Sequence, residues 1–367
     1  MPNIEDQIKA VEVEMAKTQV NKATMHHLGK LKAKLARLKD EVQKRQAKSG
    51  GGGVGYSVRK SGNATVGLVG FPSVGKSTLL NRITDAVSEV GAYDFTTLDV
   101  IPGLMEYEGA KIQILDMPGL IRGASKGRGR GREVLAVARS CDVVLLMIDV
   151  FETNTAVLAD ELYQSGIRLN ESPAEVVIAK SSRGGVRVNA TTKLTQMTEE
   201  QIVDLVREWH VNADVVVRED VTQDRLIDVL AGNRTYVKAL VVVNKVDLVD
   251  KAYMAELSKR LSGWTVVAIS AEKKSNLDLL RKTIYESLNF IRVYMKPQGK
   301  EADMVEPLIV KGASTVGMVC DTLHREFRKK FRYAMVWGKS ARFPGQTVGL
   351  DHVLQDHDIL TVVIKRR

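Results

Sequence analysis

The stretch GFPSVGKSTLL, residues 70–80, follows an apolar and β-branched run at residues 65–69. A glycine followed by four residues and Gly-Lys-Ser is the pattern of a phosphate-binding loop. In such a loop the backbone N–H groups surround a phosphate at the start of a helix. In that pattern Lys76 reaches the β- and γ-phosphate oxygens, and the Ser77 hydroxyl binds Mg²⁺. The sequence therefore predicts a strand, a phosphate loop and a helix. The loop residues that we expect to contact the nucleotide are Gly70, Pro72, Ser73, Val74, Gly75, Lys76, Ser77 and Thr78.

A second motif, DMPG at residues 116–119, follows another apolar run. Asp116 can hold Mg²⁺ through water and the Gly119 N–H can meet a γ-phosphate, because nucleotide sites form at the carboxyl ends of parallel strands. Between the two motifs, DFTTLDVIPG at residues 94–103 offers Thr97 or Thr96 as a second hydroxyl for the metal, and a pair of threonines in a β-turn is the alternative. We predict Lys76, Thr97 and Gly119 as catalytic groups, and Ser77, Thr97 and Asp116 as metal ligands.

A third motif, NKVD at residues 244–247, ends a later apolar run and selects the base. A carboxylate at Asp247 accepts both the N1–H and the 2-amino group of guanine, which adenine cannot supply, so such a site prefers GTP to ATP. We expect Lys245 to lie over the base and Asn244 to brace the phosphate loop. In SAE, residues 270–272, the Ala271 N–H can meet guanine O6, and Ser270 belongs to the same part of the site.

Apolar runs alternate with helical patterns from residue 64 onward. The runs are TVGLVG, KIQILD, DVVLLMIDV, ALVVVNKVD and WTVVAIS. Runs of this kind interleaved with helices are typical of a parallel sheet covered on both faces, so we predict an α/β P-loop nucleotide domain over residues 61–290. The more polar segment 154–236 interrupts this rhythm and is predicted to be an inserted α/β subdomain.

The two ends of the chain have other patterns. Apolar residues spaced by three and four at residues 4–15 and 28–42 predict two amphipathic helices, joined by a turn at residues 18–24 into a hairpin within residues 1–48. Residues 49–60 are predicted to be a glycine-rich linker. Residues 291–367 predict a small α+β domain, with one amphipathic helix at residues 316–331 and a last strand at residues 359–364.

The net charge of +10 is concentrated at the ends of the chain. Residues 1–60 hold 13 Lys and Arg against 6 Asp and Glu, residues 291–367 hold 14 against 8, and the middle holds 27 against 30. Basic chain ends, including the lysine-rich second helix, suit contact with RNA. The alternative is that these charges only keep the protein in solution. Two distant cysteines, a charged N-terminal stretch and the lack of an apolar run near 20 residues predict a cytoplasmic protein without a membrane span. We expect His26 and His27 to be a surface pair.

Together these motifs resemble the developmentally regulated GTP-binding proteins, a branch of the Obg-like translation-factor GTPases. The stretches that carry the resemblance are NKATMHHLGKLKAKLARL, GFPSVGKSTLL, AYDFTTL, KGRGRGREVLAVAR, GIRLN and YAMVWG. The resemblance implies a Ras-like GTPase domain, an N-terminal helix-turn-helix, an insert similar to a ribosomal-protein fold and a C-terminal ubiquitin-like (β-grasp) TGS domain. It also implies GTP hydrolysis to GDP linked to ribosomes or RNA and, in eukaryotic members, a stabilising partner protein. We expect the chain itself to be a monomer.

Hydrolysis lacks one familiar group in this sequence. Ras-type enzymes orient the attacking water with a glutamine directly after the Asp-x-x-Gly motif, and Leu120 stands at that place. Because an aliphatic side chain cannot orient water, we expect slow intrinsic hydrolysis. Families with this substitution often recruit K⁺, in some members through an asparagine of the phosphate loop; Ser73 stands there, so K⁺ rests on the resemblance alone.

The glycine-rich segment SKGRGRGRE, residues 125–133, is a candidate second switch. An arginine finger, contact with ribosomal RNA and a solvated loop all stay open for it. Its basic residues are Lys126, Arg128, Arg130 and Arg132.

The leading hypothesis is a GTP-hydrolysing switch that engages the translation machinery through its basic ends. The alternative is a nucleotide-gated RNA-binding or scaffold protein in which GTP turnover is incidental. An ATP-dependent small-molecule kinase is disfavoured by Asp247.

Overall fold

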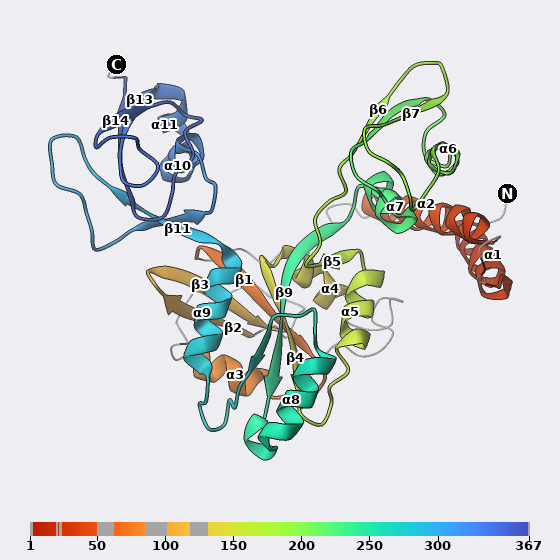
Figure 1. The fold of residues 1–367 in the computed structure, drawn as a ribbon, viewed down its shortest axis with the longest axis horizontal. Coiled ribbons are helices and arrows are strands. Elements are labelled where there is room, and N and C mark those ends of the chain that lie inside the picture. Colours follow the sequence, from red (N-terminus) through yellow and green to blue (C-terminus); the bar gives the residue numbers. More distant parts are fainter. Residues whose placement is uncertain are drawn as a thin grey trace. The chain divides into compact units, whose positions relative to one another are not determined.

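The computed structural model describes residues 3–19, 21, 24–49, 62–84, 101–117 and 131–365 (Figure 1). The chain divides into two compact units. One consists of residues 1–56 and 166–236, and the other of residues 57–165 and 237–367.

The second unit contains the sheet on which the predicted motifs lie. Its strands are β1 (Ala64–Gly70), β2 (Ile101–Tyr107), β3 (Ala110–Asp116), β4 (Val143–Asp149), β9 (Thr235–Asn244) and β10 (Val266–Ala268). They are hydrogen-bonded in the order β10, β9, β4, β1, β3, β2, and all neighbours are parallel except β2, which is antiparallel to β3. Every residue of β1 and β4 is buried, as expected for parallel strands covered on both faces.

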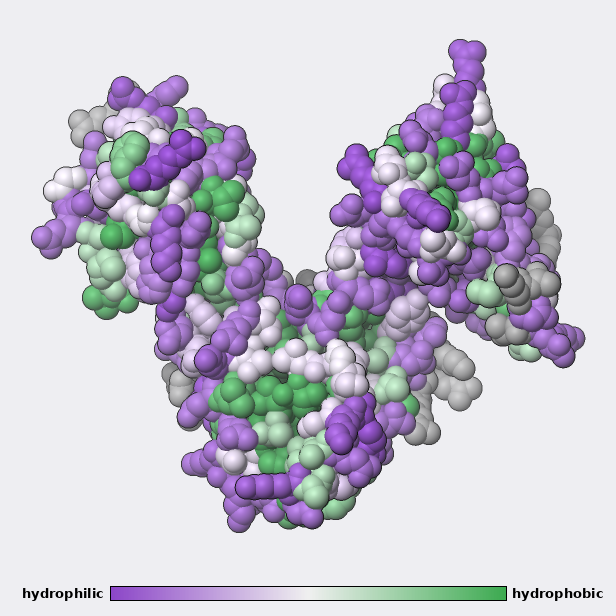
Figure 2. Space-filling model, in the orientation of Figure 1, coloured by the Kyte–Doolittle hydropathy of each residue, from purple (hydrophilic) through white to green (hydrophobic). Residues whose placement is uncertain are grey.

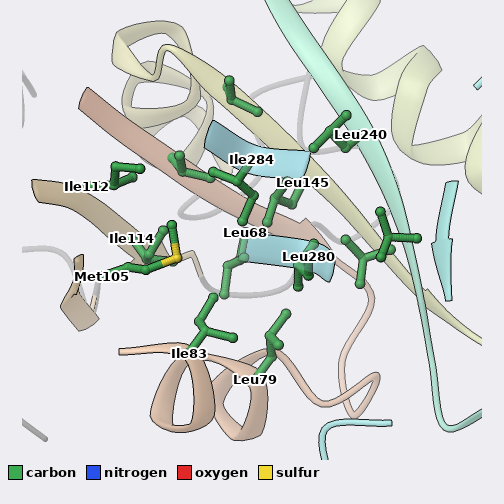
Figure 3. Packing of buried hydrophobic residues seen from close by; sticks show 14 of the residues in the cluster. Leu68, Leu79, Ile83, Met105, Ile112, Ile114, Leu145, Leu240, Leu280 and Ile284 are labelled. Carbon is green, nitrogen blue, oxygen red and sulfur yellow. The ribbon is translucent and has the colours of Figure 1, made fainter. Parts of the chain in front are cut away.

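Helices on one face of this sheet close a large hydrophobic core (Figure 3). The helices of this part of the chain are α3 (Lys76–Ile83), α4 (Gly131–Ser140), α5 (Thr155–Gln164), the short 3₁₀ helix η2 (Val246–Leu248), α8 (Lys251–Arg260) and α9 (Leu277–Leu288). Leu79 of α3 and Leu280 of α9 meet Leu68 of β1 in one cluster. Burying each such side chain contributes roughly 1.5–3 kcal/mol, so the core fixes the helix that follows the phosphate loop.

The first unit combines the N-terminal helices with the insert. Its elements are α1 (Ile4–Lys17), α2 (Met25–Ser49), β5 (Ile167–Leu169), β6 (Val176–Lys180), β7 (Val186–Ala190), α6 (Glu199–Arg207), β8 (Ala213–Val217) and α7 (Gln223–Ala231). In its small sheet, β8 lies between β6 and β7. Leu31 and Leu38 of α2 pack against Val11 of α1, whereas Ala33 of α2 is buried in the core of the insert. The second helix therefore joins the hairpin to the insert.

Several basic groups of α2 are paired with carboxylates of the same unit. Lys30 Nζ lies 2.7 Å from Asp204 Oδ2, and Lys32 Nζ lies 2.9 Å from Asp224 Oδ1. These partly exposed pairs add little stability, but they neutralise charge that a free lysine would offer to a phosphate backbone. This face of α2 is less suited to RNA than its sequence suggests.

The C-terminal domain, described here from Phe290 to residue 365, forms a separate mixed sheet with two short helices. Its elements are β11 (Phe290–Met295), β12 (Leu308–Lys311), α10 (Val316–Leu323), α11 (Arg325–Lys330), β13 (Phe331–Trp337), β14 (Gln346–Val348) and β15 (Asp358–Ile364). The strand order is β12, β11, β15, β13, β14, with β11 and β15 parallel. Apolar residues of the segment predicted as an amphipathic helix lie in its core, where Val316, Val319 and Cys320 are fully buried.

The single helix predicted at residues 316–331 is wrong, because the structure has two helices there. His324 adopts an extended conformation (φ −167°, ψ 136°), which interrupts the helical hydrogen-bond ladder. Its ring Nδ1 then accepts the Glu326 N–H at 3.2 Å and caps the second helix. Phe331, predicted as the last helical residue, instead begins β13.

The C-terminal domain is joined to the nucleotide domain through a short connection. Asn289 alone separates α9 from β11, and it has a left-handed backbone with φ 50°. Phe290 and Ile309 belong to the same hydrophobic cluster as the sheet of the nucleotide domain. The connection is therefore packed rather than solvated.

An ion-pair network accompanies this connection. The Arg292 guanidinium donates to both carboxylate oxygens of Asp356, at 3.1 and 2.7 Å, and to Glu108 in the β2–β3 turn at 2.8 Å. The hydrogen bond from Arg292 lowers the pKa of Asp356 to about 2. The β2–β3 turn is thus tied to the C-terminal domain.

Hydrophilic residues cover most of the surface visible in Figure 2. Within the described segments, no helix combines the length and the apolar character needed to cross a bilayer. One exposed large apolar side chain is Phe151, which is 73% exposed and follows β4.

Candidate nucleotide-binding site

The carboxyl ends of four parallel strands lie along one edge of the sheet. Strand pairing places Leu68 of β1 beside Asp116 at the end of β3, and Asp149 at the end of β4 beside Asn244 at the end of β9. β3 lies on one side of β1 and β4 on the other, and in sheets with such a change of direction ligands bind at the carboxyl ends of the strands. The predicted motifs follow these strands.

Two glycines allow the phosphate loop to lie close against the sheet edge. A Cβ at Gly70 would lie 2.3 Å from the Met147 carbonyl oxygen, and one at Gly75 would lie 2.4 Å from Asn244 Nδ2. Gly75 also has φ 94°, a backbone conformation that L-residues rarely adopt. It precedes α3 without supplying a side-chain cap, so first-turn N–H groups are available for an anion.

Lys76 is held inside this loop. Its Nζ donates to the carbonyls of Phe71 at 2.9 Å and Gly70 at 3.2 Å, and the residue is 8% exposed. Burial lowers the pKa of Lys76, and the nearby Asp116 carboxylate opposes that effect. A phosphate group at the loop would offset the same desolvation with its own charge.

Ser77 and Asp116 bring two oxygen donors together. Ser77 Oγ donates to Asp116 Oδ2 at 2.5 Å, and Asp116 is 7% exposed. A hydroxyl and a carboxylate are the hard oxygen ligands that Mg²⁺ prefers alongside water and phosphate. Among the described residues, no cluster of three or more His, Cys, Asp or Glu side chains could hold a metal ion.

Several predicted site residues lie outside the described segments. They are Thr96, Thr97, Gly119, Leu120, Lys126, Arg128 and Arg130. Arg132 lies in the first turn of α4, but its side chain is also outside the description. The roles predicted for these residues, those of the candidate second switch included, therefore stay predictions.

Asn244 connects the phosphate loop to the turn that follows β10. Its Nδ2 donates to the Val74 carbonyl at 2.9 Å, and its Oδ1 accepts the Ala271 N–H at 3.0 Å. Asn244 is 3% exposed. The expected hydrogen bond from the Ala271 N–H to guanine O6 differs from this arrangement, because that N–H already has a partner on the asparagine.

The NKVD motif and the SAE turn also meet through the backbone. The Val246 N–H donates to the Ile269 carbonyl at 3.2 Å. Ser270 is buried, and its Oγ accepts the Lys273 N–H at 3.1 Å, which fixes the turn. Asp247 lies in η2 with an exposed carboxylate. The acid predicted to read the base is thus accessible to a ligand.

Lys245 has a partner that the sequence analysis missed. Its Nζ lies 2.5 Å from Asp149 Oδ2 and donates to the Ser73 carbonyl at 3.0 Å. Asp149 is the last residue of β4, near the end of the apolar run DVVLLMIDV, and an acid at that place is the signal in the sequence that could have found it. Lys245 Nζ also lies 6.0 Å from the centre of the Phe151 ring.

Known proteins that are similar to this chain indicate its family. A family described as "50S ribosome-binding GTPase" matches residues 65–180, its C-terminal region matches residues 183–290, and the TGS domain matches residues 291–364. A protein of Dictyostelium discoideum named developmentally-regulated GTP-binding protein 2 homolog is 44% identical over 98% of this chain and 99% of its own length. This chain belongs to the developmentally regulated GTP-binding protein family. The resemblance and the fold class predicted from the sequence are confirmed.

Other relatives are similar to this chain over most of their length. An uncharacterized GTP-binding protein of Methanocaldococcus jannaschii is 54% identical over 99% of this chain and 93% of its own length. Developmentally-regulated GTP-binding protein 1 of Xenopus laevis is 42% identical over 98% of each chain. Among solved structures, the YchF GTPase of Schizosaccharomyces pombe superposes with a TM-score of 0.48 at 16% identity, covering 83% of this chain and 99% of that one.

Proposed function

We propose that this chain binds GTP and GDP and hydrolyses GTP to GDP and phosphate as a slow molecular switch. The observation that carries the proposal is the pair of hydrogen bonds made by Asn244, to the phosphate loop and to the turn after β10. One side chain thereby links the residues expected at the phosphates with those expected at the base. The names of the relatives as GTP-binding proteins support the same activity.

Guanine selection is assigned to Asp247. Asp247→Asn replaces an acceptor of two guanine N–H groups with a side chain that can donate to the 2-oxo group of xanthine. We expect the variant to bind GDP more weakly and xanthosine diphosphate more tightly than the wild type in calorimetry, with ADP as the control nucleotide. Unaltered preference for guanine would contradict this assignment.

Mg²⁺ is the metal that the donor set of Ser77 and Asp116 suits. When bound, it neutralises charge on the β- and γ-phosphates. We propose Ser77 and Asp116 as the residues that hold it, together with Thr97. We propose that the chain's own contribution is the Lys76 ammonium, which would contact the phosphate oxygens; its burial in the loop supports this role.

The rate of hydrolysis is proposed to be low without a partner. Leu120 cannot orient water, so another group must do so. K⁺ is one candidate, and single-turnover hydrolysis measured in KCl, NaCl and CsCl tests it. A faster rate in KCl alone supports K⁺, and equal rates in the three salts exclude it.

We propose ribosomes or RNA as the partner of the switch in the cytoplasm, with the chain a monomer and, in a eukaryotic source, a stabilising partner protein. The proposal is supported by the description of the matching family and by the basic C-terminal domain. Because Lys30 and Lys32 are paired within their unit, we place the RNA contact on the exposed basic residues of the C-terminal domain, Arg325, Lys329 and Arg332.

Single-turnover GTP hydrolysis with and without ribosomes tests the switch. We expect ribosomes to accelerate it, and an Arg325→Ala, Lys329→Ala, Arg332→Ala variant to need more ribosomes for the same rate. Binding to RNA that is equal with GTP and GDP, without acceleration, would instead favour a scaffold with incidental turnover.

A further inference from the structure

Asp149 is a buried acid at the candidate site that none of the nucleotide motifs includes. It ends β4 and is 5% exposed. Its Oδ2 receives Lys245 Nζ at 2.5 Å. We propose that Asp149 is a positioning residue of the nucleotide site, which fixes the Lys245 side chain where the purine binds. This inference rests on the proposed GTP and GDP binding.

The two carboxylate oxygens of Asp149 have separate partners. Oδ1 accepts the N–H groups of Phe151 at 3.0 Å and Glu152 at 2.8 Å, which shapes the turn after β4. Oδ2 pairs with Lys245. Burial alone would raise the pKa of Asp149, but the hydrogen bonds from Lys245, Glu152 and Phe151 outweigh it and lower the pKa overall. The carboxylate is thus held ionised beside the lysine.

Lys245 is fixed at both ends by this arrangement. Its backbone has a left-handed conformation with φ 62°, and its ammonium group is shared between Asp149 and the Ser73 carbonyl. A long lysine side chain otherwise loses considerable rotamer freedom when a ligand immobilises it. Because these two contacts hold the lysine side chain, the base would meet a preformed surface, and binding would cost less entropy.

The same contacts connect base and phosphate recognition. Lys245 donates to Ser73 in the phosphate loop, and its neighbour Asn244 donates to Val74 in the same loop. Asp149 therefore acts on the phosphate loop through the lysine. Loss of its charge should weaken GDP binding without direct contact between Asp149 and the nucleotide.

Asp149→Asn separates the positioning role from the turn. The asparagine oxygen can still accept the two backbone N–H groups, whereas the ion pair with Lys245 is lost. We expect GDP affinity, measured by calorimetry on the full chain, to fall about tenfold, the loss expected for one charge-assisted hydrogen bond. A matched control is Asp142→Asn, just before β4, where Lys311 and the Thr65 N–H contact the acid. Its GDP affinity should stay within twofold of the wild type.

A double-mutant cycle shows whether the effect passes through the lysine. Adding Asp149→Asn to Lys245→Met should cause no further loss of GDP affinity, because the partner is already gone. Equal losses in both backgrounds would overturn the proposal, and so would an unchanged affinity of Asp149→Asn. If wild-type chain fails to bind GDP, the proposed function fails instead.

If Asp149→Asn does not fold, two variants of Lys245 test the same proposal. Lys245→Arg keeps a cation that can pair with the carboxylate, whereas Lys245→Met does not. We expect the arginine variant to retain most of the GDP affinity. Equal losses in the two lysine variants would show that the ion pair contributes nothing to binding and would overturn the proposal.

Discussion

Replacing Asn244 with alanine removes two buried hydrogen bonds at once. The side chain donates to the Val74 carbonyl at 2.9 Å and accepts the Ala271 N–H at 3.0 Å. Val74 and Ala271 are each 1% exposed, so water does not readily replace the lost partner. At about 1–1.5 kcal/mol for each bond, the change removes roughly 2–3 kcal/mol from the folded site.

The loss should appear in nucleotide affinity. Without Asn244, the phosphate loop and the turn after β10 are no longer fixed to each other, and a nucleotide that contacts both must order them on binding. If the free energy of GDP binding becomes less favourable by the whole 2–3 kcal/mol, GDP affinity falls roughly 30- to 150-fold, since every 1.4 kcal/mol is a factor of ten.

Two measurements check this prediction. Calorimetry gives the GDP affinity, and hydrogen exchange of the Ala271 amide reports the bond directly. Asn244→Asp is the matched variant, because its carboxylate still accepts the Ala271 N–H but cannot donate to the Val74 carbonyl. We expect it to keep the slow exchange of this amide and still lose GDP affinity. A loss below threefold in Asn244→Ala, with unchanged amide exchange, would refute the reasoning.

Two further predictions concern backbone strain and acid stability. Gly75→Ala places a Cβ on a backbone with φ 94°, 2.4 Å from Asn244 Nδ2, so we expect at least a tenfold loss of GDP affinity. The control is Gly185→Ala, where φ is 74° and the Cβ would have no atom within 4 Å. This variant should bind GDP like the wild type. The folded-state pKa of Asp356 is lowered to about 2 by Arg292, so its stabilising effect is present above pH 4 and is lost as pH falls from about 4 towards 2. The difference in urea unfolding midpoint between wild type and Arg292→Met should therefore shrink over that range, and a constant difference would count against the ion pair.

The nucleotide motifs and the sheet were predictable because their signals are local. A phosphate loop needs glycines at fixed positions, and buried parallel strands give unbroken apolar runs, so the fold class followed from residues such as Gly70 and Gly75. The strand β2 was not predicted, because Pro102 and Gly103 interrupt its apolar pattern. It forms a strand through its antiparallel pairing with β3, which the local sequence does not reveal.

Contacts between distant residues could not be predicted in the same way. The pairing of Asp149 with Lys245 joins positions 96 residues apart, and an acid after a strand gives no indication of its partner. Likewise Lys32 looked available for RNA until the fold placed Asp224 beside it. The helix break at His324 depends on one backbone conformation that an amphipathic pattern does not reveal.

The single-residue connection at Asn289 has a mechanical consequence. Phe290, directly after it, is buried in the cluster that also contains α3 and α9 residues such as Leu79 and Leu280. A torque applied to the C-terminal sheet is therefore transmitted into the helix layer beneath the phosphate loop instead of being absorbed by a slack tether. A large partner bound to this domain could therefore alter the conformation of the phosphate loop.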